Sequence, residues 1–256
     1  MTKWSKYLVE RACDRPPPGC SDVIVKDSTP VLFFGNPRAK VATLGINPSR
    51  SEFLNRSGVL LSDERRRLAT LPWLGVRRYG KITSELGSKI IDECARYFEP
   101  ERNPYGWFNA LDEILREGIG ASYFNKTACH LDLAQWATSP VWGKMKKSVR
   151  GWRAIQSKLL ADGINFLRMQ LDTEHYDFVL VNGRAVICEI QKAKLTKWNP
   201  VKRLNGPPKA DLYTGEYGKT KFLAWSCNIQ SQPGARRHIP ALARFVAKHS
   251  GKRRAT

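Results

Sequence analysis

Short apolar runs alternate along the chain with longer stretches whose apolar residues recur at helical spacing. Continuous apolar runs are typical of strands covered on both faces, as in parallel sheets. Strands are predicted at residues 41–46, 178–181 and 222–226, with a shorter strand at 31–34 and one that ends in polar residues at 121–133. Helices are predicted at residues 62–71, 81–97, 107–117, 148–160, 184–194 and 239–248. This order favours an α/β fold, and we expect a three-layer α/β/α sandwich around a mostly parallel, four-stranded sheet.

Composition along the chain predicts one main domain with two flanking pieces. Residues 1–30 contain a run of three prolines and are expected to form a peripheral N-terminal segment. Residues 31–250 form the expected α/β/α domain. Within it, residues 195–220 are rich in proline, glycine and lysine and are predicted to be a long loop. Residues 251–256 are expected to be a basic tail.

The most informative segment is Gly45-Ile46-Asn47-Pro48-Ser49, at the end of the strand predicted over 41–46. Pro48 cannot donate a hydrogen bond to a sheet and restricts the residue before it, so the strand stops there. The side chain of Asn47 is then placed at the carboxyl end of a central strand, where open α/β sheets bind ligands. The alternative is that Asn47 is only a turn residue.

The charge of the chain narrows the kind of ligand. Its 256 residues include 43 Lys and Arg against 23 Asp and Glu, a formal net charge of +20. This balance favours polyanions, so a polar site at a strand end suggests chemistry on nucleic acid. Because the chain has no run of 18 apolar residues and no signal-peptide core near its start, we expect a cytoplasmic protein that does not enter a membrane.

The six cysteines are scattered and include no C-x-x-C pair, which argues against a zinc ribbon or an iron–sulfur cluster. We expect free, mostly buried thiols, as is usual in the cytosol. The sequence singles out no metal and no cofactor, and we expect a monomer.

A strand that ends in Gly45-Ile46-Asn47-Pro48-Ser49 resembles the first motif of the uracil-DNA glycosylase superfamily, most closely that of its mismatch-specific branch. The resemblance extends from about residue 30 to 250 in the order and spacing of the elements. Asn125 and the residues after it look like the strand whose Asn reads the flipped base. Residues 227–236 lie where the family has its second motif. There Asn228 can stand for the family's His or Asn, but Ile229 follows it in place of proline.

The resemblance implies a monofunctional DNA glycosylase, which flips a base out of DNA and hydrolyses its N-glycosidic bond to leave an abasic site. Asn47 and Asn228 are its catalytic candidates. Asn47 would position water through its amide oxygen, and Asn228 would stabilise the departing base. The substrate-binding candidates, with Phe53 as a stacking platform and Asn125 as the reader of the base edge, are Gly45, Ile46, Pro48, Ser49, Phe53, Asn125, His130 and Asp132.

Basic, amide and aromatic side chains in the second half of the chain are candidates for contacts with DNA. Trp198 is expected to be exposed because polar residues flank it, and it is the best aromatic candidate for a base or sugar contact. The full set is Lys192, Lys194, Lys197, Trp198, Gln232, Arg236 and Arg237.

Several alternatives remain open. The substrate is either a deaminated base, such as uracil or hypoxanthine, in repair, or a hypermodified phage base, such as glucosylated hydroxymethylcytosine, in antiviral defence. A nucleic-acid-binding module without catalysis would keep the basic surface. Asp177 with Glu189 and Lys192 faintly resembles the pattern of a metal-dependent nuclease. His130 and Asp132 could equally be a hydrogen-bonded structural pair.

Overall fold

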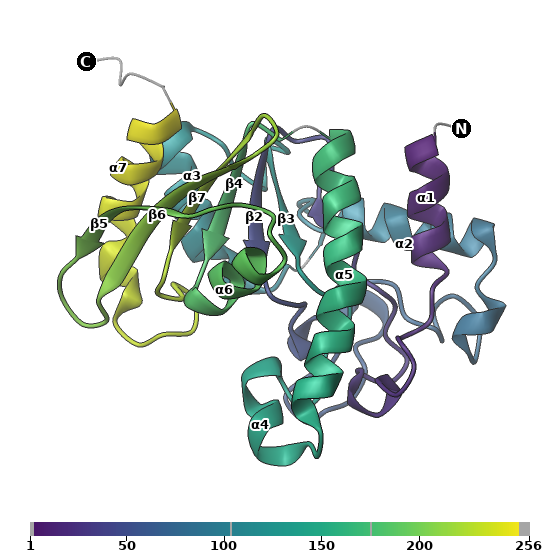
Figure 1. The fold of residues 1–256 in the computed structure, drawn as a ribbon. Coiled ribbons are helices and arrows are strands. Elements are labelled where there is room, and N and C mark those ends of the chain that lie inside the picture. The colour runs from purple at the N-terminus through teal and green to yellow at the C-terminus, as the bar shows by residue number, and fades with distance from the viewer. Residues whose placement is uncertain (1–2, 103, 175, 251–256) are drawn as a thin grey trace. The chain divides into compact units, whose positions relative to one another are not determined.

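The computed structural model describes residues 3–102, 104–174 and 176–250, which form helices and one seven-stranded sheet (Figure 1). The chain divides into two compact units. Unit 1 consists of residues 1–35, 47–105 and 132–167, and unit 2 consists of residues 36–46, 106–131 and 168–256. The predicted basic tail at 251–256 lies outside the described residues.

The sheet is mixed. Its order is β1-β3-β2-β4-β7-β6-β5. Strands β2, β4 and β7 are parallel neighbours, whereas β6 is antiparallel to both β7 and β5. The α/β class is confirmed, but the expected four-stranded, mostly parallel sheet is wrong, because the sheet has seven strands and includes antiparallel pairs. The strands are β1 (Phe34–Gly35), β2 (Val41–Gly45), β3 (Ala128–Asp132), β4 (Phe178–Asn182), β5 (Asn199–Leu204), β6 (Ala210–Tyr217) and β7 (Thr220–Trp225).

The antiparallel part of the sheet replaces the long loop predicted at 195–220. Prolines and glycine gather in the turn at residues 205–208, which joins β5 to β6. Strand β6 then turns directly into β7 at Gly218, whose φ of 57° suits a tight turn. The prediction failed because the turn residues and lysines of this segment outweighed the few buried positions of β6, such as Ala210 and Leu212.

Helices lie on both faces of the sheet in unit 2. Figure 1 shows α6 (Arg184–Lys192) in front of the sheet and α3 (Asn109–Ile119) and α7 (Ile239–Ser250) behind it. Helices α3 and α7 approach closely at Gly118, where an added Cβ would lie 3.1 Å from the carbonyl oxygen of Ala243. Unit 2 therefore has the three layers expected of an α/β/α fold.

Unit 1 is built from α1 (Lys3–Ala12), α2 (Ser84–Ala95), α4 (Met145–Ser148) and the first part of α5 (Trp152–Glu174). Two predicted helices differ. Residues 62–71 form only a short 3-10 turn at Asp63–Arg65, and the helix predicted at 148–160 begins at Trp152 and runs on to Glu174. In the N-terminal segment that we expected to be peripheral, Leu8 and Val9 are buried.

Buried polar groups fix α1 within unit 1. The guanidinium of Arg11 donates to Asp162 at 2.5 and 2.9 Å, to Asp14 at 3.0 Å and to the side-chain oxygen of Gln135 at 2.9 Å. Helix α1 also packs closely on α2, because Gly87 leaves room where a Cβ would come within 2.8 Å of the Cys13 sulfur. Arg11 therefore joins α1 to α5 through charge-assisted hydrogen bonds.

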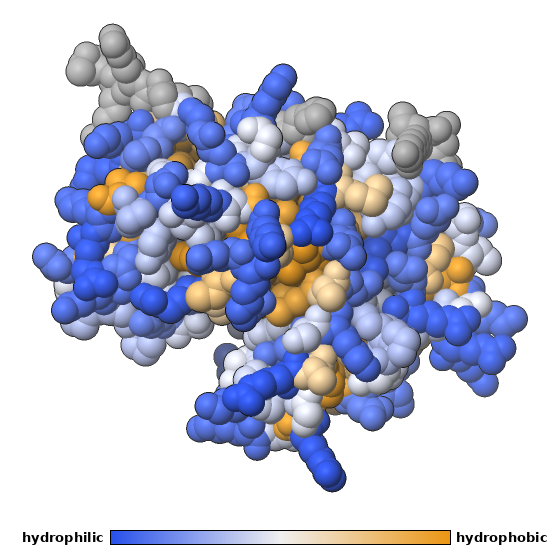
Figure 2. Space-filling model, in the orientation of Figure 1, coloured by the Kyte–Doolittle hydropathy of each residue, from blue (hydrophilic) through white to orange (hydrophobic). Residues whose placement is uncertain are grey.

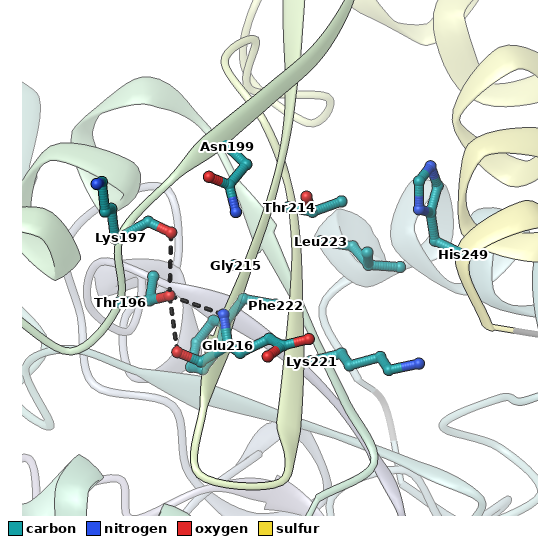
Figure 3. A pocket seen from close by; sticks show the side chains of 10 residues that line it. All are labelled: Thr196, Lys197, Asn199, Thr214, Gly215, Glu216, Lys221, Phe222, Leu223 and His249. Carbon is teal, nitrogen blue, oxygen red and sulfur yellow. Dashed lines mark hydrogen bonds between the residues drawn. The ribbon is translucent and has the colours of Figure 1, made fainter.

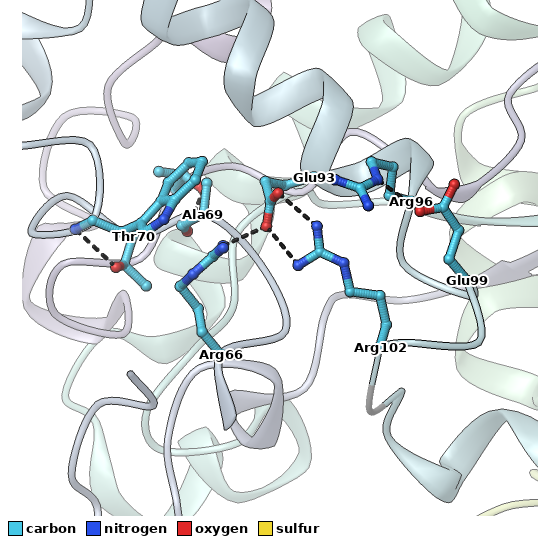
Figure 4. A network of polar contacts seen from close by, with 9 residues as sticks. Arg66, Ala69, Thr70, Glu93, Arg96, Glu99 and Arg102 are labelled. Carbon is cyan, nitrogen blue, oxygen red and sulfur yellow. Dashed lines mark hydrogen bonds and ion pairs between the residues drawn. The ribbon is translucent and has the colours of Figure 1, made fainter. Parts of the chain in front are cut away.

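A second polar network crosses unit 1 at Glu93 of α2, as Figure 4 shows. This buried carboxylate accepts hydrogen bonds from Arg102, at 2.8 and 3.2 Å, and from Arg66. Two arginines on one carboxylate give the buried charge the partners that it needs away from water. The network fixes the segments before and after α2.

Hydrophilic residues cover most of the face that Figure 2 shows, and apolar residues are visible near its centre. Among the residues that the structure describes, no helix combines the length and the apolar character that crossing a bilayer requires. The 43 Lys and Arg and 23 Asp and Glu residues of the chain agree with this largely hydrophilic face.

Candidate functional site

Asn47 lies in unit 1, two residues beyond the end of β2, as the sequence predicted. Its side-chain nitrogen Nδ2 faces three acceptors: the carbonyl oxygen of Pro48 at 3.0 Å, that of Trp136 at 3.3 Å and the hydroxyl of Thr138 at 3.3 Å. Acceptors on this side fix which end of the amide is nitrogen. The oxygen Oδ1 of Asn47 has no hydrogen-bond partner among the residues described.

The segment after Asn47 is short and well ordered. Pro48 is buried, and the hydroxyl of Ser49 accepts from the backbone N–H of Ser51 at 3.2 Å, which begins a single 3-10 turn, Arg50–Glu52. Gly45 is the buried last residue of β2, and Ile46 is half-buried. Pro48 and Ser49 therefore act here on the backbone that holds Asn47 in place.

The prediction that Phe53 stacks on a flipped base is wrong. Its side chain is buried, with 1% of its surface exposed, so it forms part of the core and offers no open face to a flipped base. The prediction placed it near Asn47 in sequence, but the 3-10 turn directs it inward. An aromatic residue so deeply buried is worth more to folding than to stacking on a ligand.

Glu52, next to Phe53, is a buried carboxyl group. Tyr97 donates its phenolic hydrogen to Glu52 at 2.5 Å and accepts from the backbone N–H of Tyr105 at 2.9 Å. Burial raises the pKa of Glu52 to about 7, against the lowering effects of the Tyr97 hydrogen bond and the charge of Arg67. The charge of Asp132, a predicted substrate-binding residue that is itself buried, raises this pKa further.

Asn228, the second catalytic candidate, lies in unit 2 after β7. Its side-chain oxygen accepts from the backbone N–H groups of Gln230 at 3.1 Å and Ser231 at 3.0 Å. These two donors identify the held atom as the amide oxygen, whereas in Asn47 the held atom is the amide nitrogen. The nitrogen Nδ2 of Asn228 has no hydrogen-bond partner in the part of the chain that the structure describes.

Asn182 organises this segment, and the sequence reasoning did not single it out. Its side-chain oxygen accepts from the indole of Trp225 at 2.7 Å and from the backbone N–H of Ile229 at 3.1 Å, and its nitrogen donates to Gln230 at 2.5 Å. It is buried at the end of β4, as Asn47 is placed after β2. A polar residue that directly ends an apolar strand was the signal that could have found it.

The residue after Asn182 is Gly183, which has a φ of 103° and opens into α6. Only glycine adopts such a conformation without strain. The same position faces Asn228, because an added Cβ would lie 3.6 Å from the Cβ of Asn228 and 3.7 Å from its Nδ2. The turn at 182–183 therefore packs directly against the Asn228 amide.

Asn125 does not lie on the strand on which it was predicted. The strand predicted at 121–133 begins only at Ala128, and Asn125 lies in the turn before it, at the amino end of β3. Its side-chain oxygen accepts from both the backbone N–H, at 3.1 Å, and the hydroxyl of Thr127. This is the geometry of an Asx turn, so the described contacts of Asn125 serve the turn and not the reading of a base.

His130 is a core residue of unit 2. Its Nδ1 lies 2.6 Å from the hydroxyl of Thr43, which is in turn 2.6 Å from the hydroxyl of Tyr123. The rings of Trp107 and Phe108 contact the imidazole edge-on, and only 1% of the residue is exposed. These contacts favour the structural alternative for His130, because the ring is enclosed within the unit.

The candidates for DNA contact lie in unit 2 and are mostly exposed. Lys192 is paired with Glu189 at 2.6 Å, and Gln232 accepts from the backbone N–H of Asn228 at 3.3 Å. Trp198 is the exception: it is half-buried, and its indole donates to the carbonyl oxygen of Ile187 at 3.2 Å. The residues that remain exposed without an ion pair in the described structure are Lys194, Lys197, Arg236 and Arg237.

Lys197 also lines a cavity of about 450 Å³ in unit 2 (Figure 3). The wall combines Lys197, Asn199 and Lys221 with the carboxylate-bearing Glu216 and with His249, whose pKa is lowered by burial and by the charges of Lys248 and Lys221. The mixture of acid and base makes this cavity a weaker anion site than a purely cationic one would be.

The structure does not place the residues of the nuclease pattern as that pattern requires. Glu189 and Lys192 lie on α6 and pair with each other, whereas the pattern requires them on a strand of a hairpin with Asp177. Within the described ranges, no group of three or more His, Cys, Asp or Glu residues is arranged to hold a metal ion.

No protein-family model matches this chain, and no curated protein sequence matches it. The case for a function therefore rests on the residues and their contacts.

Proposed function

We propose that this protein is a DNA glycosylase that hydrolyses the N-glycosidic bond of an extruded base. The observation that carries the proposal is the orientation of the Asn47 amide. Three acceptors hold its nitrogen, so its oxygen is presented as a fixed acceptor at the end of β2. A fixed acceptor is the group that can hold a water molecule by one of its hydrogens.

In this reaction the bond between the sugar C1′ and the base nitrogen breaks, and its electron pair leaves with the base. The sugar becomes oxocarbenium-like and is captured by water, whose proton passes to the solvent, while the departing base anion takes up a proton from the solvent. An amide does not accept a proton near neutral pH, so Asn47 would position the water without deprotonating it. We therefore expect slow chemistry that depends on the ease with which the base leaves.

Asn228 is a separate candidate for stabilising a leaving base. Its oxygen is occupied by two backbone N–H groups, so its Nδ2 is presented as a donor. Negative charge develops on the departing base, and a preorganised donor stabilises that charge. A donor held in this way is suited to that role, and it is a candidate of unit 2 in its own right.

The substrate is DNA with a deaminated base, uracil or hypoxanthine, or with a hypermodified phage base, such as glucosylated hydroxymethylcytosine. The net charge of +20 supports the nucleic acid as partner, because phosphate contacts supply most of the binding energy to DNA. The first pair of bases gives the protein a role in repair, and the second type gives it a role in antiviral defence.

The test is base release from a panel of duplex and single-stranded DNAs that carry each of these bases, in EDTA, with abasic sites read by alkaline cleavage. We expect one base to be released by the native protein and not by Asn47→Ala. Asn205→Ala, which changes an exposed asparagine in the β5–β6 turn, is the matched control and should retain activity. DNA binding without abasic sites across the whole panel would instead favour a binding module without catalysis.

A further inference from the structure

Unit 1 contains a cavity of about 650 Å³ that lies wholly within that unit. Four cationic side chains line it: Arg50, Arg56, Arg67 and Lys144. No carboxylate lines it. A cavity walled by charges of one sign concentrates the opposite charge, because its low-dielectric walls focus the field.

Other arginines of unit 1 are paired with carboxylates, unlike most of the cations that line the cavity. Arg66 and Arg102 both pair with Glu93, and Arg96 pairs with Glu99 and Glu101. By comparison, Arg50, Arg56 and Lys144 form no ion pair with any residue that the structure describes. The chain thus pairs its structural cations and leaves these three facing the cavity.

Arg67 is held in place, and Arg50 lies close to the backbone of Gly58. Arg67 donates to the carbonyl oxygen of Ser51 at 2.5 Å and lies over the ring of Tyr105, 5.6 Å from its centroid. The guanidinium of Arg50 passes over Gly58, where an added Cβ would lie 3.6 Å from Nη2. Guanidinium groups that are already ordered lose less entropy when they bind an anion, and their planar forks match phosphate oxygens.

The rest of the wall is apolar or uncharged. Its apolar part consists of Leu54, Leu61, Pro140, Val141 and the ring of Tyr105. The volume is within the range of small-molecule pockets, and it is larger than an isolated phosphate needs. A ligand that fills the cavity therefore combines an anionic group with a less polar body.

We infer that this cavity binds one phosphorylated nucleotide unit, with its phosphate on Arg50, Arg56, Arg67 and Lys144 and its sugar or base against the apolar wall. The phosphate is either a backbone phosphate of DNA or that of a free nucleotide. The inference deepens the proposed function, on which it rests, by naming a nucleotide subsite. It concerns binding alone, so it can hold or fail separately from base hydrolysis.

The test compares two double variants that remove the same charge. Arg56→Gln with Lys144→Gln changes two exposed cavity residues, whereas Lys146→Gln with Lys147→Gln changes two exposed residues of the adjacent α4 that do not line it. The affinity of each for a labelled oligonucleotide is measured by fluorescence anisotropy over a range of salt concentrations. Competition with thymidine monophosphate and with inorganic phosphate is measured on the native protein.

We expect the cavity variant to lose roughly tenfold in affinity and about one unit of the slope of log K against log salt, while the α4 variant changes little. Equal losses in both double variants, or none in either, would overturn the inference. Competition by thymidine monophosphate would assign the cavity to a free nucleotide. If thymidine monophosphate does not compete, but only the cavity variant loses affinity for the oligonucleotide, the cavity binds a phosphate of the DNA backbone. Inorganic phosphate that competes as well as the nucleotide would overturn the role of the apolar wall.

A third variant tests the geometry of the arginine fork. Arg50→Lys keeps the charge and removes the planar guanidinium, so it should weaken binding less than Arg50→Gln does and more than the α4 control does. Urea denaturation of each variant checks that the fold is retained, and matching midpoints allow the affinities to be compared directly.

Discussion

The hydroxyl of Tyr97 donates to the buried carboxyl of Glu52 at 2.5 Å, and the same hydroxyl accepts from the backbone N–H of Tyr105 at 2.9 Å. This relay joins the segment after Asn47 to the end of α2 and to the residues that follow it. Glu52 is 2% exposed, so a change in its protonation changes the charge in the interior of unit 1.

The first prediction concerns stability against pH. Burial raises the pKa of Glu52 from 4.5 to about 7, so the folded protein holds this proton more tightly than the unfolded chain does. The resulting stabilisation is fully present below pH 4.5 and is lost as the pH rises through 7. It amounts to about 3 kcal/mol, from roughly 1.4 kcal/mol for each pKa unit.

Glu52→Gln cannot ionise and should remove this contribution to the pH dependence. Urea denaturation between about pH 4 and 8 measures it, and the difference between the native and variant profiles isolates Glu52 from the other carboxyl groups. Parallel profiles across this range would show that Glu52 keeps an ordinary pKa in the folded protein.

The second prediction concerns the surroundings of Asn47. In Asn47→Asp, a carboxylate oxygen would replace Nδ2 and face the carbonyl oxygens of Pro48 and Trp136. Facing acceptors repel, so the variant should be less stable than Asn47→Ala at pH 7 by about 1–3 kcal/mol. Protonation of the introduced carboxyl group would restore a donor, so the stability of the variant should recover as the pH falls. Equal stability of the two variants at neutral pH, measured by urea denaturation, would contradict the orientation of the amide.

The third prediction concerns Asn182. Asn182→Ala removes the acceptor of the Trp225 indole and of the Ile229 N–H, and both donors are buried in unit 2. Each of the two unsatisfied buried donors costs about 1–3 kcal/mol, so we expect a loss of about 2–6 kcal/mol and faster amide exchange at residues 228–232. Hydrogen exchange measures the local effect, and exchange that is unchanged in this segment would separate Asn182 from the Asn228 loop.

The fourth prediction concerns helix packing in unit 1. An added Cβ at Gly163 of α5 would lie 2.0 Å from the carbonyl oxygen of Leu133 and 2.8 Å from the Cα of Ala134. Backbone cannot yield as a flexible side chain does, so Gly163→Ala should destabilise the protein by about 3 kcal/mol or more. Gly143→Ala is the control, because nothing lies within 4 Å of the corresponding Cβ. Thermal denaturation should separate the two, and similar midpoints would contradict the close packing.

Much of the parallel core of the fold could be predicted from sequence. Residues 41–46 and 178–181 coincide closely with β2 and β4, because strands buried on both faces leave a continuous apolar run. The position of Asn47 was predicted from Pro48, which ends the strand because it cannot donate a hydrogen bond to a sheet. Strand β5 lies at the edge of the sheet, and all of its residues except Leu204 are exposed. It therefore has no alternation of apolar and polar residues by which a strand could be recognised.

The individual roles of the candidate residues depended on tertiary contacts, which the sequence does not contain. His130 was predicted from its alternation with Asp132 at a strand end, and Phe53 from its place near Asn47 in the sequence, but packing encloses both. Trp198 was judged by its polar neighbours, and its contacts with Phe222 and with the carbonyl oxygen of Ile187 come from other elements. The cationic cavity joins segments at 50–67, 105 and 140–144, which no local pattern connects.

Strand β5 has a further consequence for the behaviour of the protein at high concentration. It is the last strand of the sheet. Pro200 and the exposed Lys202 and Arg203 lie along it, and its pairing with β6 shifts in register between Pro200 and Lys202. An unprotected edge would recruit the strands of other copies, whereas proline withholds a donor and like charges repel. We therefore expect Pro200 and Lys202 to hinder the pairing of β5 with a strand of another copy, a role that does not depend on any contact with DNA.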